Sequence, residues 1–140
     1  MANLMKKYKI KMFKKKLLRP YYAIKHAYQR VTRGFSDNDA WNADKFLAAQ
    51  LSGILMWFVN EGHGVPMSYA REDDLYGQDT EYMTAARDAE YKKYAAMFEE
   101  YGKHGHAVND KWKSMFGGLT DAEVHDMMTW LAEHFTELWD

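Results

Sequence analysis

Cysteine is absent from the 140 residues of this sequence, and only two prolines occur in it. Without cysteine the chain has no disulfide framework, no thiolate zinc ligands and no thiol nucleophile, which suits a reducing compartment such as the cytoplasm. No apolar run approaches the ~20 residues that a membrane-spanning helix needs. Because no continuous apolar segment follows Lys6 and Lys7, we expect no secretory signal.

Acidic residues are absent from the first 36 positions, which contain eleven lysines and arginines. Residues 37 to 140 contain eight Lys or Arg against twenty Asp or Glu, so charges of +11 and −12 give the net charge of −1. This asymmetry indicates a basic arm that either meets an external polyanion or lies on its own acidic body.

Apolar residues make up 47% of the chain and aromatic residues 16%, which is enough to form the core of one domain. Their spacing predicts helices over residues 20–33, 37–60, 80–101 and 120–138, with a weaker one over 108–116. Pro20 fits the first turn of the first of these helices. Residues 1–16 fit a strand or a helix equally. The prediction is an all-α fold, a single compact bundle of four or five helices over residues 20–140 with a basic N-terminal arm over residues 1–19.

Local signals mark several of these helix ends. Gly34 is expected to cap the C-terminus of the first helix. Ser36 and Asp39 form a variant of the capping box, and Thr120 and Glu123 form a regular one. The segment 37–60 has the clearest apolar stripe, which consists of Leu47, Leu51, Ile54, Leu55 and Phe58.

The segment RGFSDNDAWNAD, residues 33 to 44, contains the best candidate site. If Leu51 is the centre of the apolar stripe and each residue turns the helix by ~100°, Asp44 lies about 20° and Asp37 about 40° from that centre. A carboxylate aimed at the core needs a partner, and we expect Arg30 or Arg33 to pair with Asp44. Asp39 is expected to be a helix-start charge alone.

Two interpretations of this segment stay open. In the first, a structural ion pair fixes the crossing of two helices. In the second, Arg33, Asp37, Trp41 and Asp44 line a polar pocket with an aromatic wall that holds a small polar ligand by hydrogen bonds and stacking. Glu90, in the middle of the apolar face of residues 80–101, is expected to form a structural ion pair with Arg87, with a lysine or with a cation of the N-terminal segment.

The sequence contains none of the usual catalytic or metal-binding motifs. No Glu is followed by His at i+3, as in di-iron bundles, and HExxH, GxSxG and glycine-rich phosphate loops are missing. We therefore predict no catalytic residue, no metal site and no cofactor, and the protein is not expected to be an enzyme.

The basic arm supports an alternative function, because it mixes cations with Tyr8, Phe13, Tyr21, Tyr22 and Tyr28, as phosphate-tracking and base-stacking surfaces do. An amphipathic helix on a membrane surface has a similar composition. In the plainest interpretation its aromatics pack on the bundle. The predicted nucleic-acid contacts are Lys6, Lys7, Lys9, Lys11, Lys14, Lys15, Lys16 and Arg19.

The stretch RGFSDNDAWNADKFLA, with HGVP about twenty residues later and LAEHFTELWD at the C-terminus, resembles a family of small helical phage and prophage proteins. The match is good over residues 20–66 and fair over the last helix. The resemblance implies a phage-encoded accessory protein that works inside an infected bacterium, and it implies no particular activity. The family motif corresponds to Arg33, Gly34, Phe35, Ser36, Asp37, Asp39, Trp41, Asp44, His63, Gly64 and Pro66.

The leading functional hypothesis is a non-enzymatic binding protein in the cytoplasm of the infected host. It would sequester a small polar or anionic ligand, or inhibit a host protein such as a defence component. Arg33 would contact an anionic group, Trp41 would stack, Asp37 and Asp44 would orient donors, and His63 completes the expected ligand-binding set. The alternatives are a nucleic-acid-binding accessory factor and a minor virion or scaffold component, and the chain could also self-associate.

Overall fold

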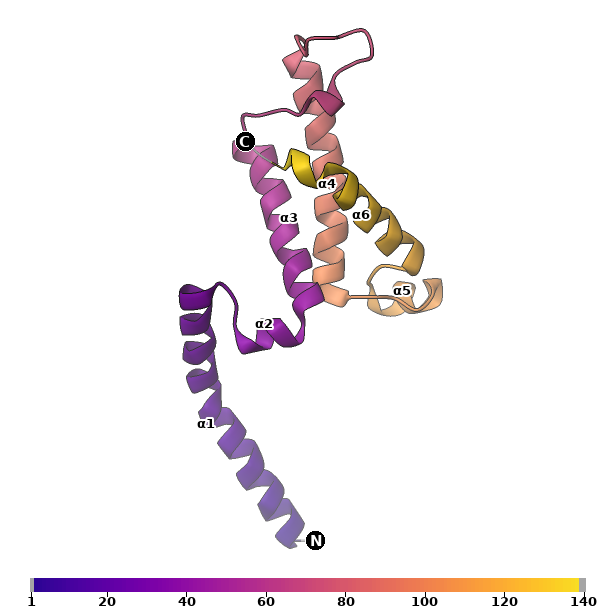
Figure 1. Ribbon diagram of the computed structural model, residues 1–140. Coiled ribbons are helices and arrows are strands. Elements are labelled where there is room, and N and C mark those ends of the chain that lie inside the picture. The colour runs from indigo at the N-terminus through magenta and orange to yellow at the C-terminus, as the bar shows by residue number, and fades with distance from the viewer. Residues whose placement is uncertain (1, 139–140) are drawn as a thin grey trace. The chain divides into compact units, whose positions relative to one another are not determined.

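The computed structural model describes residues 2–138, with side chains described for residue 16 and for residues 18–138. This part of the chain contains helices and no β-strand, which confirms the all-α fold class (Figure 1). The elements are α1 (Ala2–Arg33), α2 (Asp37–Trp41), α3 (Ala43–Glu61), η1 (Met67–Tyr69), α4 (Thr80–His104), α5 (Asp110–Phe116), α6 (Asp121–His134) and η2 (Phe135–Glu137).

The chain divides into two compact units, Met1–Ala43 and Asp44–Asp140. The boundary that we expected between residues 19 and 20 lies within α1, because that helix starts at Ala2 and continues through Pro20. Lys, Leu, Met and Ala dominate the basic segment, and they are good helix formers. Pro20 has no backbone N–H, so one hydrogen bond of the helix is missing there. The helix continues past Pro20 although a proline in the interior of a helix lowers its stability.

Most of the predicted capping signals are present. Gly34, at φ 84°, donates its N–H to the Arg30 carbonyl at 2.9 Å and ends α1. The capping boxes of Ser36 with Asp39 and of Thr120 with Glu123 are both formed.

The predicted helix over residues 37–60 is in fact two helices, α2 and α3. Asn42 interrupts it with a non-helical backbone, φ −125° and ψ 49°, and donates its N–H to the Asp39 carbonyl. The Asn42 amide also donates to the Asn38 carbonyl at 3.3 Å. Asn side chains compete in this way with the backbone hydrogen bonds of a helix, and the pattern of apolar residues does not reveal it.

Helices α3 and α4 lie side by side and antiparallel in the second unit (Figure 1). Near one end Arg87 of α4 contacts the Phe58 carbonyl, and in the middle the Ser52 hydroxyl donates to the Ala95 carbonyl at 2.9 Å. At the other end a Cβ on Gly102 would lie 3.3 Å from the Lys45 carbonyl oxygen. Small residues therefore let the two backbones approach closely along their length.

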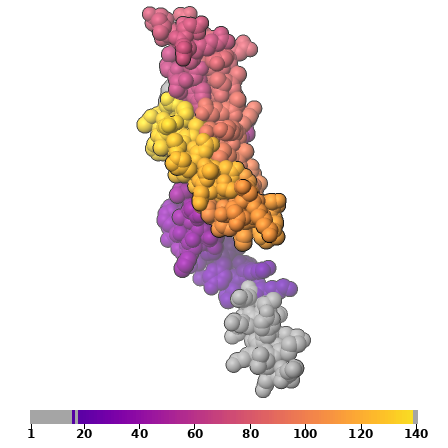
Figure 2. Space-filling view, turned by 90° about the vertical axis from the view of Figure 1, so that its right-hand side faces the viewer, coloured from indigo at the N-terminus to yellow at the C-terminus, as the bar shows by residue number. Residues whose placement is uncertain are grey.

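Helix α6 completes the core of this unit. The segment from α5 to η2, orange to yellow, covers one side of the α3–α4 pair in the space-filling view (Figure 2). Leu55, Tyr91, Phe98, Met127 and Trp130 are buried where the three helices meet. The Trp130 ring stacks on Tyr94 with centroids 4.3 Å apart, so aromatic packing dominates this junction.

The buried stripe of α3 is rotated from the predicted one. Ala48, Ser52, Leu55 and Phe58 are buried, while Leu47 and Ile54, which we placed in the stripe, are exposed. Because α3 is apolar around most of its circumference, hydrophobic spacing alone does not fix which side faces the core. The close approach of α4 selects the side with the small residues.

Arg87 is the one strongly buried cation among the described residues, with 2% of its surface exposed. Its guanidinium donates to the Phe58 carbonyl at 3.1 Å, to the Gly64 carbonyl, and to Asp88 Oδ1 at 2.8 and 3.0 Å. The cation thus sits at the C-terminal end of α3, where the helix dipole favours positive charge. From the sequence we expect Arg87 only as a partner for Glu90, and its burial is not predicted.

We expect Arg87→Met to lower the free energy of unfolding by about 3 to 5 kcal/mol, because it removes the guanidinium bonds to the Phe58 and Gly64 carbonyls and leaves the Asp88 carboxylate without its cation. Urea denaturation measures this loss. The exposed Lys92→Met, on the same helix, is the matched control and should change stability by less than about 0.5 kcal/mol. Equal effects of the two substitutions would show that Arg87 does not hold α3 to α4.

Candidate functional site

Asp39 is the fixed charge of the segment RGFSDNDAWNAD, with 6% of its surface exposed. It accepts from Arg30 Nε at 2.7 Å and Nη2 at 2.6 Å, and from the Ser36 N–H and hydroxyl at 2.8 Å. The expectation that Asp39 is a helix-start charge alone is therefore wrong. The capping box itself contained the signal, since the carboxylate at its third helical position turns back toward the start of the helix and the segment before it.

Asp37 and Arg33, which we placed together in a ligand pocket, form an ion pair with each other. Asp37 also accepts from Gln29 Nε2 at 2.8 Å and pairs with Lys25 Nζ at 3.0 Å. Arg33 Nε donates to the Phe35 carbonyl at 2.9 Å. The polar groups that we expected to contact a ligand thus bond to one another and attach α2 to α1.

These contacts lower the pKa of both carboxyl groups. Gln29, Arg33 and Lys25 hold the pKa of Asp37 well below its usual range, and the Arg30 guanidinium, helped by the Ser36 donors, does the same for Asp39. Both groups are therefore carboxylates throughout the ordinary pH range, and neither can act as a proton donor near neutral pH.

Trp41, by contrast, contributes little to packing, because 88% of its surface is exposed. Its position at the last residue of α2 leaves the indole open to solvent. An aromatic side chain so exposed is available for contact with a ligand or partner.

Asp44 lies at the rim of the core, on the side of α3 that the helical spacing predicts. It is exposed in the first turn of α3, where the helix dipole favours a carboxylate, and it accepts from the Tyr101 hydroxyl at 3.1 Å. Neither predicted arginine is its recorded partner, since Arg30 bonds to Asp39 and Arg33 to Asp37. The carboxylate is exposed because Asp44 lies at the end of the helix, in the first turn of α3.

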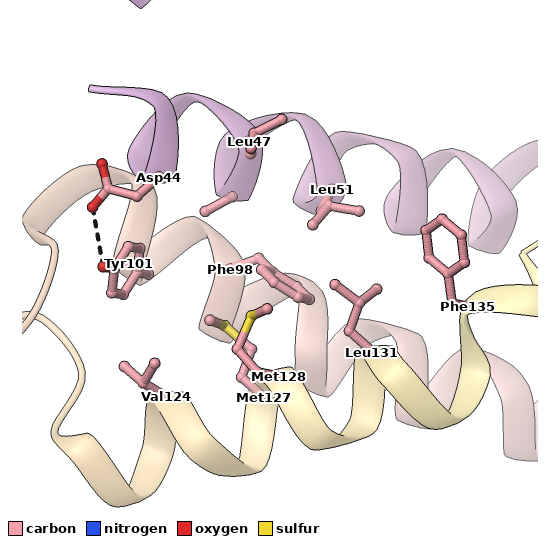
Figure 3. Close-up of a pocket in the computed structure, with 11 residues that line it drawn as sticks. Asp44, Leu47, Leu51, Phe98, Tyr101, Val124, Met127, Met128, Leu131 and Phe135 are labelled. Carbon is pink, nitrogen blue, oxygen red and sulfur yellow. Dashed lines mark hydrogen bonds between the residues drawn. The ribbon is translucent and has the colours of Figure 1, made fainter. Parts of the chain in front are cut away.

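A pocket of about 400 Å³ opens beside Asp44, between α3, α4, α6 and η2. Asp44 and Tyr101 lie at one end of it and Phe135 at the other (Figure 3). Burial, together with the Asp44 carboxylate, raises the pKa of Tyr101, so its hydroxyl stays protonated and donates to Asp44. The lining residues are Asp44, Leu47, Ala48, Leu51, Phe98, Tyr101, Val124, Met127, Met128, Leu131 and Phe135.

This pocket combines a long apolar wall with one carboxylate, and that combination determines what it can bind. The apolar side chains favour a hydrocarbon portion, and Asp44 favours a cation or a hydrogen-bond donor at one end. Two methionines, Met127 and Met128, contribute flexible and polarisable side chains that adapt to different shapes. The pocket was not predicted from the sequence, because its walls come from helices that lie far apart along the chain.

His63 lies at the opposite end of α3 from Asp44. It follows the last residue of α3 by two positions, so about 28 Å of helix axis separates it from Asp44 at ~1.5 Å per residue. The side chain is exposed and does not line the pocket described above. These two predicted site residues are therefore not brought together.

A second polar cluster lies in the core around Glu90. This carboxylate accepts from Trp130 Nε1 at 2.6 Å, and His134 Nε2 lies 3.7 Å from it, whereas we had expected a cation from α4 or from the N-terminal segment. His134 Nδ1 bonds to Glu137 at 2.8 Å, and the His134 ring stacks on Tyr69 and Trp130. Burial and the Glu90 charge raise the pKa of Tyr69.

The Glu90 cluster joins α4 to α6 and has no place in the pocket lining. Glu90 and Trp130 bond to each other, as polar groups buried between helices usually do, while the Tyr69 hydroxyl is buried with no hydrogen-bond partner among the described residues. Nowhere among the described residues do three His, Asp or Glu side chains gather in a way that could hold a metal ion.

The predicted nucleic-acid contacts fall on α1. The side chains of Lys6, Lys7, Lys9, Lys11, Lys14 and Lys15 lie outside the described residues, and those of Lys16 and Arg19 are exposed. None of the helices in the described part of the chain has both the length and the apolar content needed to cross a membrane.

Comparisons with known proteins add no family to this description: no family model, curated protein or solved structure matches the chain. The fold and the pocket together therefore define an all-α protein with an apolar binding pocket that has a single acidic end.

We expect Arg30→Gln to raise the pKa of the Asp39 carboxyl toward its ordinary value of about 3.9, because the main stabilising donor is lost. In the wild type the folded pKa lies below the unfolded one. The Arg30–Asp39 contact therefore stabilises the packing of α2 on α1 fully when the pH is above the pKa that Asp39 has in the unfolded chain. This stabilisation is lost as the pH falls through the pKa of Asp39 in the folded protein. Carboxyl-carbon NMR titration measures both proteins. The control Lys16→Gln should leave the Asp39 titration unchanged, and an unchanged titration in Arg30→Gln would contradict this account.

Trp41 could serve either as a packing residue of the fold or as a contact for a ligand, and its exposure favours the second role. We expect Trp41→Ala to change the free energy of unfolding by less than about 0.5 kcal/mol, because so little indole surface is buried. Trp130→Ala, which removes a buried indole, should cost about 3 to 5 kcal/mol in the same urea experiment. A comparable loss in Trp41→Ala would make Trp41 a packing residue.

Proposed function

We propose that this protein is a non-enzymatic binding protein that holds an amphiphile, a hydrocarbon chain with a cationic or hydrogen-bond-donating end group. The observation that supports the proposal is the pocket of about 400 Å³ within residues 44–138, which is apolar except at the Asp44–Tyr101 end. Small-molecule sites have volumes of roughly 300 to 1,000 Å³ and the same pattern of an apolar wall with few polar groups.

The charge at the pocket end favours this ligand class over the anionic ligand expected from the sequence. Asp44 is the one charged residue in the pocket lining, and its carboxylate repels an anion. Arg33, which we assigned to an anionic group, bonds instead to Asp37. An ammonium group near Asp44 with its chain extending toward Phe135 would satisfy both ends of the pocket.

The biological setting that we propose is a bacterium infected by the phage that encodes the protein, in whose cytoplasm it would sequester this ligand. The resemblance of RGFSDNDAWNAD, HGVP and LAEHFTELWD to phage proteins supports this setting. Inhibition of a host protein is compatible with the same pocket if the partner inserts a lysine-bearing apolar segment, which has the same chemistry as the amphiphile.

Decylammonium, decanol and decanoate test the proposal because they share one chain length and differ in the end group. We expect decylammonium to bind most tightly and decanoate most weakly in calorimetric titrations below their micelle concentrations. Asp44→Asn should reduce the preference for decylammonium over decanoate by about fivefold, since the charge at a partly exposed site is worth on the order of 1 kcal/mol.

A bulky substitution within the pocket separates this binding from other sites. Met128→Trp should fill the pocket and weaken decylammonium binding at least about tenfold. Met115 is also an exposed methionine, lies on α5 and does not line the pocket, so Met115→Trp is the matched control. If both variants bind decylammonium as the wild type does, the pocket is not the binding site.

A further inference from the structure

Helix α1 exposes a row of large apolar side chains. Tyr21, Ile24, Tyr28 and Val31 are between 60% and 86% exposed, and their spacing of three, four and three residues places them on one side of the helix. We call these four residues the apolar face of α1. In the sequence, Ile10 and Leu17 precede Ile24 and Val31 at the same seven-residue interval.

Helix α2 does not cover this face. The α1 residues that bond to Asp37 and Asp39 point, on average, roughly 140° away from the apolar face at ~100° per residue. They are Lys25, Gln29, Arg30 and Arg33. Within the unit Met1–Ala43, the packing of α2 therefore leaves the apolar face uncovered.

The cations of α1 are segregated from its apolar face. At the same angle per residue, the described cations Lys16, Arg19, Lys25, Arg30 and Arg33 all lie at least about 40° outside the arc between Val31 and Tyr21. The first 36 residues contain eleven cations and no acidic residue. Over residues 16–33 the helix is thus apolar on one side, with its cations on the others.

This charge distribution excludes most occupants of the apolar face. A second copy of α1 would bring a second set of cations without the acidic residues that pair across helical coiled coils. A nucleic acid would use the cations and stack on the tyrosines, but it would leave the exposed aliphatic side chains of Ile24 and Val31 in water. An anionic lipid surface satisfies both sides of the helix at once.

We propose that α1 docks on an anionic lipid surface, with Tyr21, Ile24, Tyr28 and Val31 inserted at the boundary between headgroups and acyl chains. The helix would lie in the plane of the surface, as basic amphipathic helices do. Tyrosine suits this boundary, since its ring is apolar and its hydroxyl polar. The exposed Lys16 and Arg19 side chains extend to lipid phosphates, whereas Lys25, Arg30 and Arg33 stay paired with Asp37 and Asp39.

Vesicle co-sedimentation of the full-length protein tests the proposal, using phosphatidylcholine vesicles with and without about 30% phosphatidylserine. We expect binding to the anionic vesicles that weakens at high salt. The double variant Ile24→Ser/Val31→Ser should lower the partition coefficient at least about tenfold by removing inserted apolar surface. Leu18→Ser, a comparable change at a half-exposed leucine about 100° from the apolar face, should alter it by less than about twofold.

Three outcomes would overturn the proposal. The first is wild-type protein that does not bind anionic vesicles, or a double variant that binds them as the wild type does. The second is tight binding of a single-stranded oligonucleotide without vesicle binding, which assigns α1 to nucleic acid. The third is dimerisation that the double variant abolishes, again without vesicle binding, which assigns the apolar face to a second copy. Circular dichroism of the variants separates loss of binding from loss of helix.

Discussion

The buried guanidinium of Arg87 is the contact on which the arrangement of residues 44–138 depends. It joins α4 to the last turn of α3 and to the Gly64 carbonyl in the segment that follows. A buried cation must keep all of its partners, so the two helices can pair in only one register at this end. At the other end the absence of a side chain at Gly102 allows the same pair to approach closely.

The pocket follows from this pairing. Because α3 and α4 are held together at both ends, α6 packs against them through Met127 and Trp130, and the residues toward the Asp44 end leave an apolar space. Phe98 closes the pocket on the α4 side, while Asp44 and Tyr101 place a polar group at its end (Figure 3). The affinity expected for an amphiphile is a consequence of how three helices meet rather than of any short motif.

The sequence predicted the features that local physics determines. The fold class followed from hydrophobic spacing. The cap at Gly34 followed from the freedom of glycine to adopt a positive φ, and the caps at Ser36 and Thr120 followed from side chains that bond to nearby backbone. The break at Asn42 was not predicted, because a single polar side chain competes for the backbone hydrogen bonds of the helix without altering the pattern of apolar residues.

Features that depend on tertiary packing could not be predicted in this way. Helix α3 is apolar on most sides, so the spacing of its apolar residues did not reveal that Leu47 and Ile54 are exposed. The burial of Arg87 depends on two carbonyls at least 23 residues away in the sequence. The pairing of Arg30 with Asp39, although signalled by the capping box, required knowledge of how α2 folds back on α1.

The two proposed contacts have related chemistry. The pocket within residues 44–138 favours an amphiphile with a positive or donating end, and α1 has the apolar face and cations that favour an anionic lipid surface. A protein with both features would meet its ligand where amphiphiles concentrate. Each contact uses different residues, so each can be removed without the other.

The central claim is that the pocket beside Asp44 binds an amphiphile, and methionine-methyl NMR during a decylammonium titration tests it most directly. The chain has ten methionines, of which Met127 and Met128 line the pocket and Met115 does not. The account predicts saturable shifts of the Met127 and Met128 methyl resonances while that of Met115 stays in place. Unchanged resonances, or shifts of all methionines alike, would contradict it.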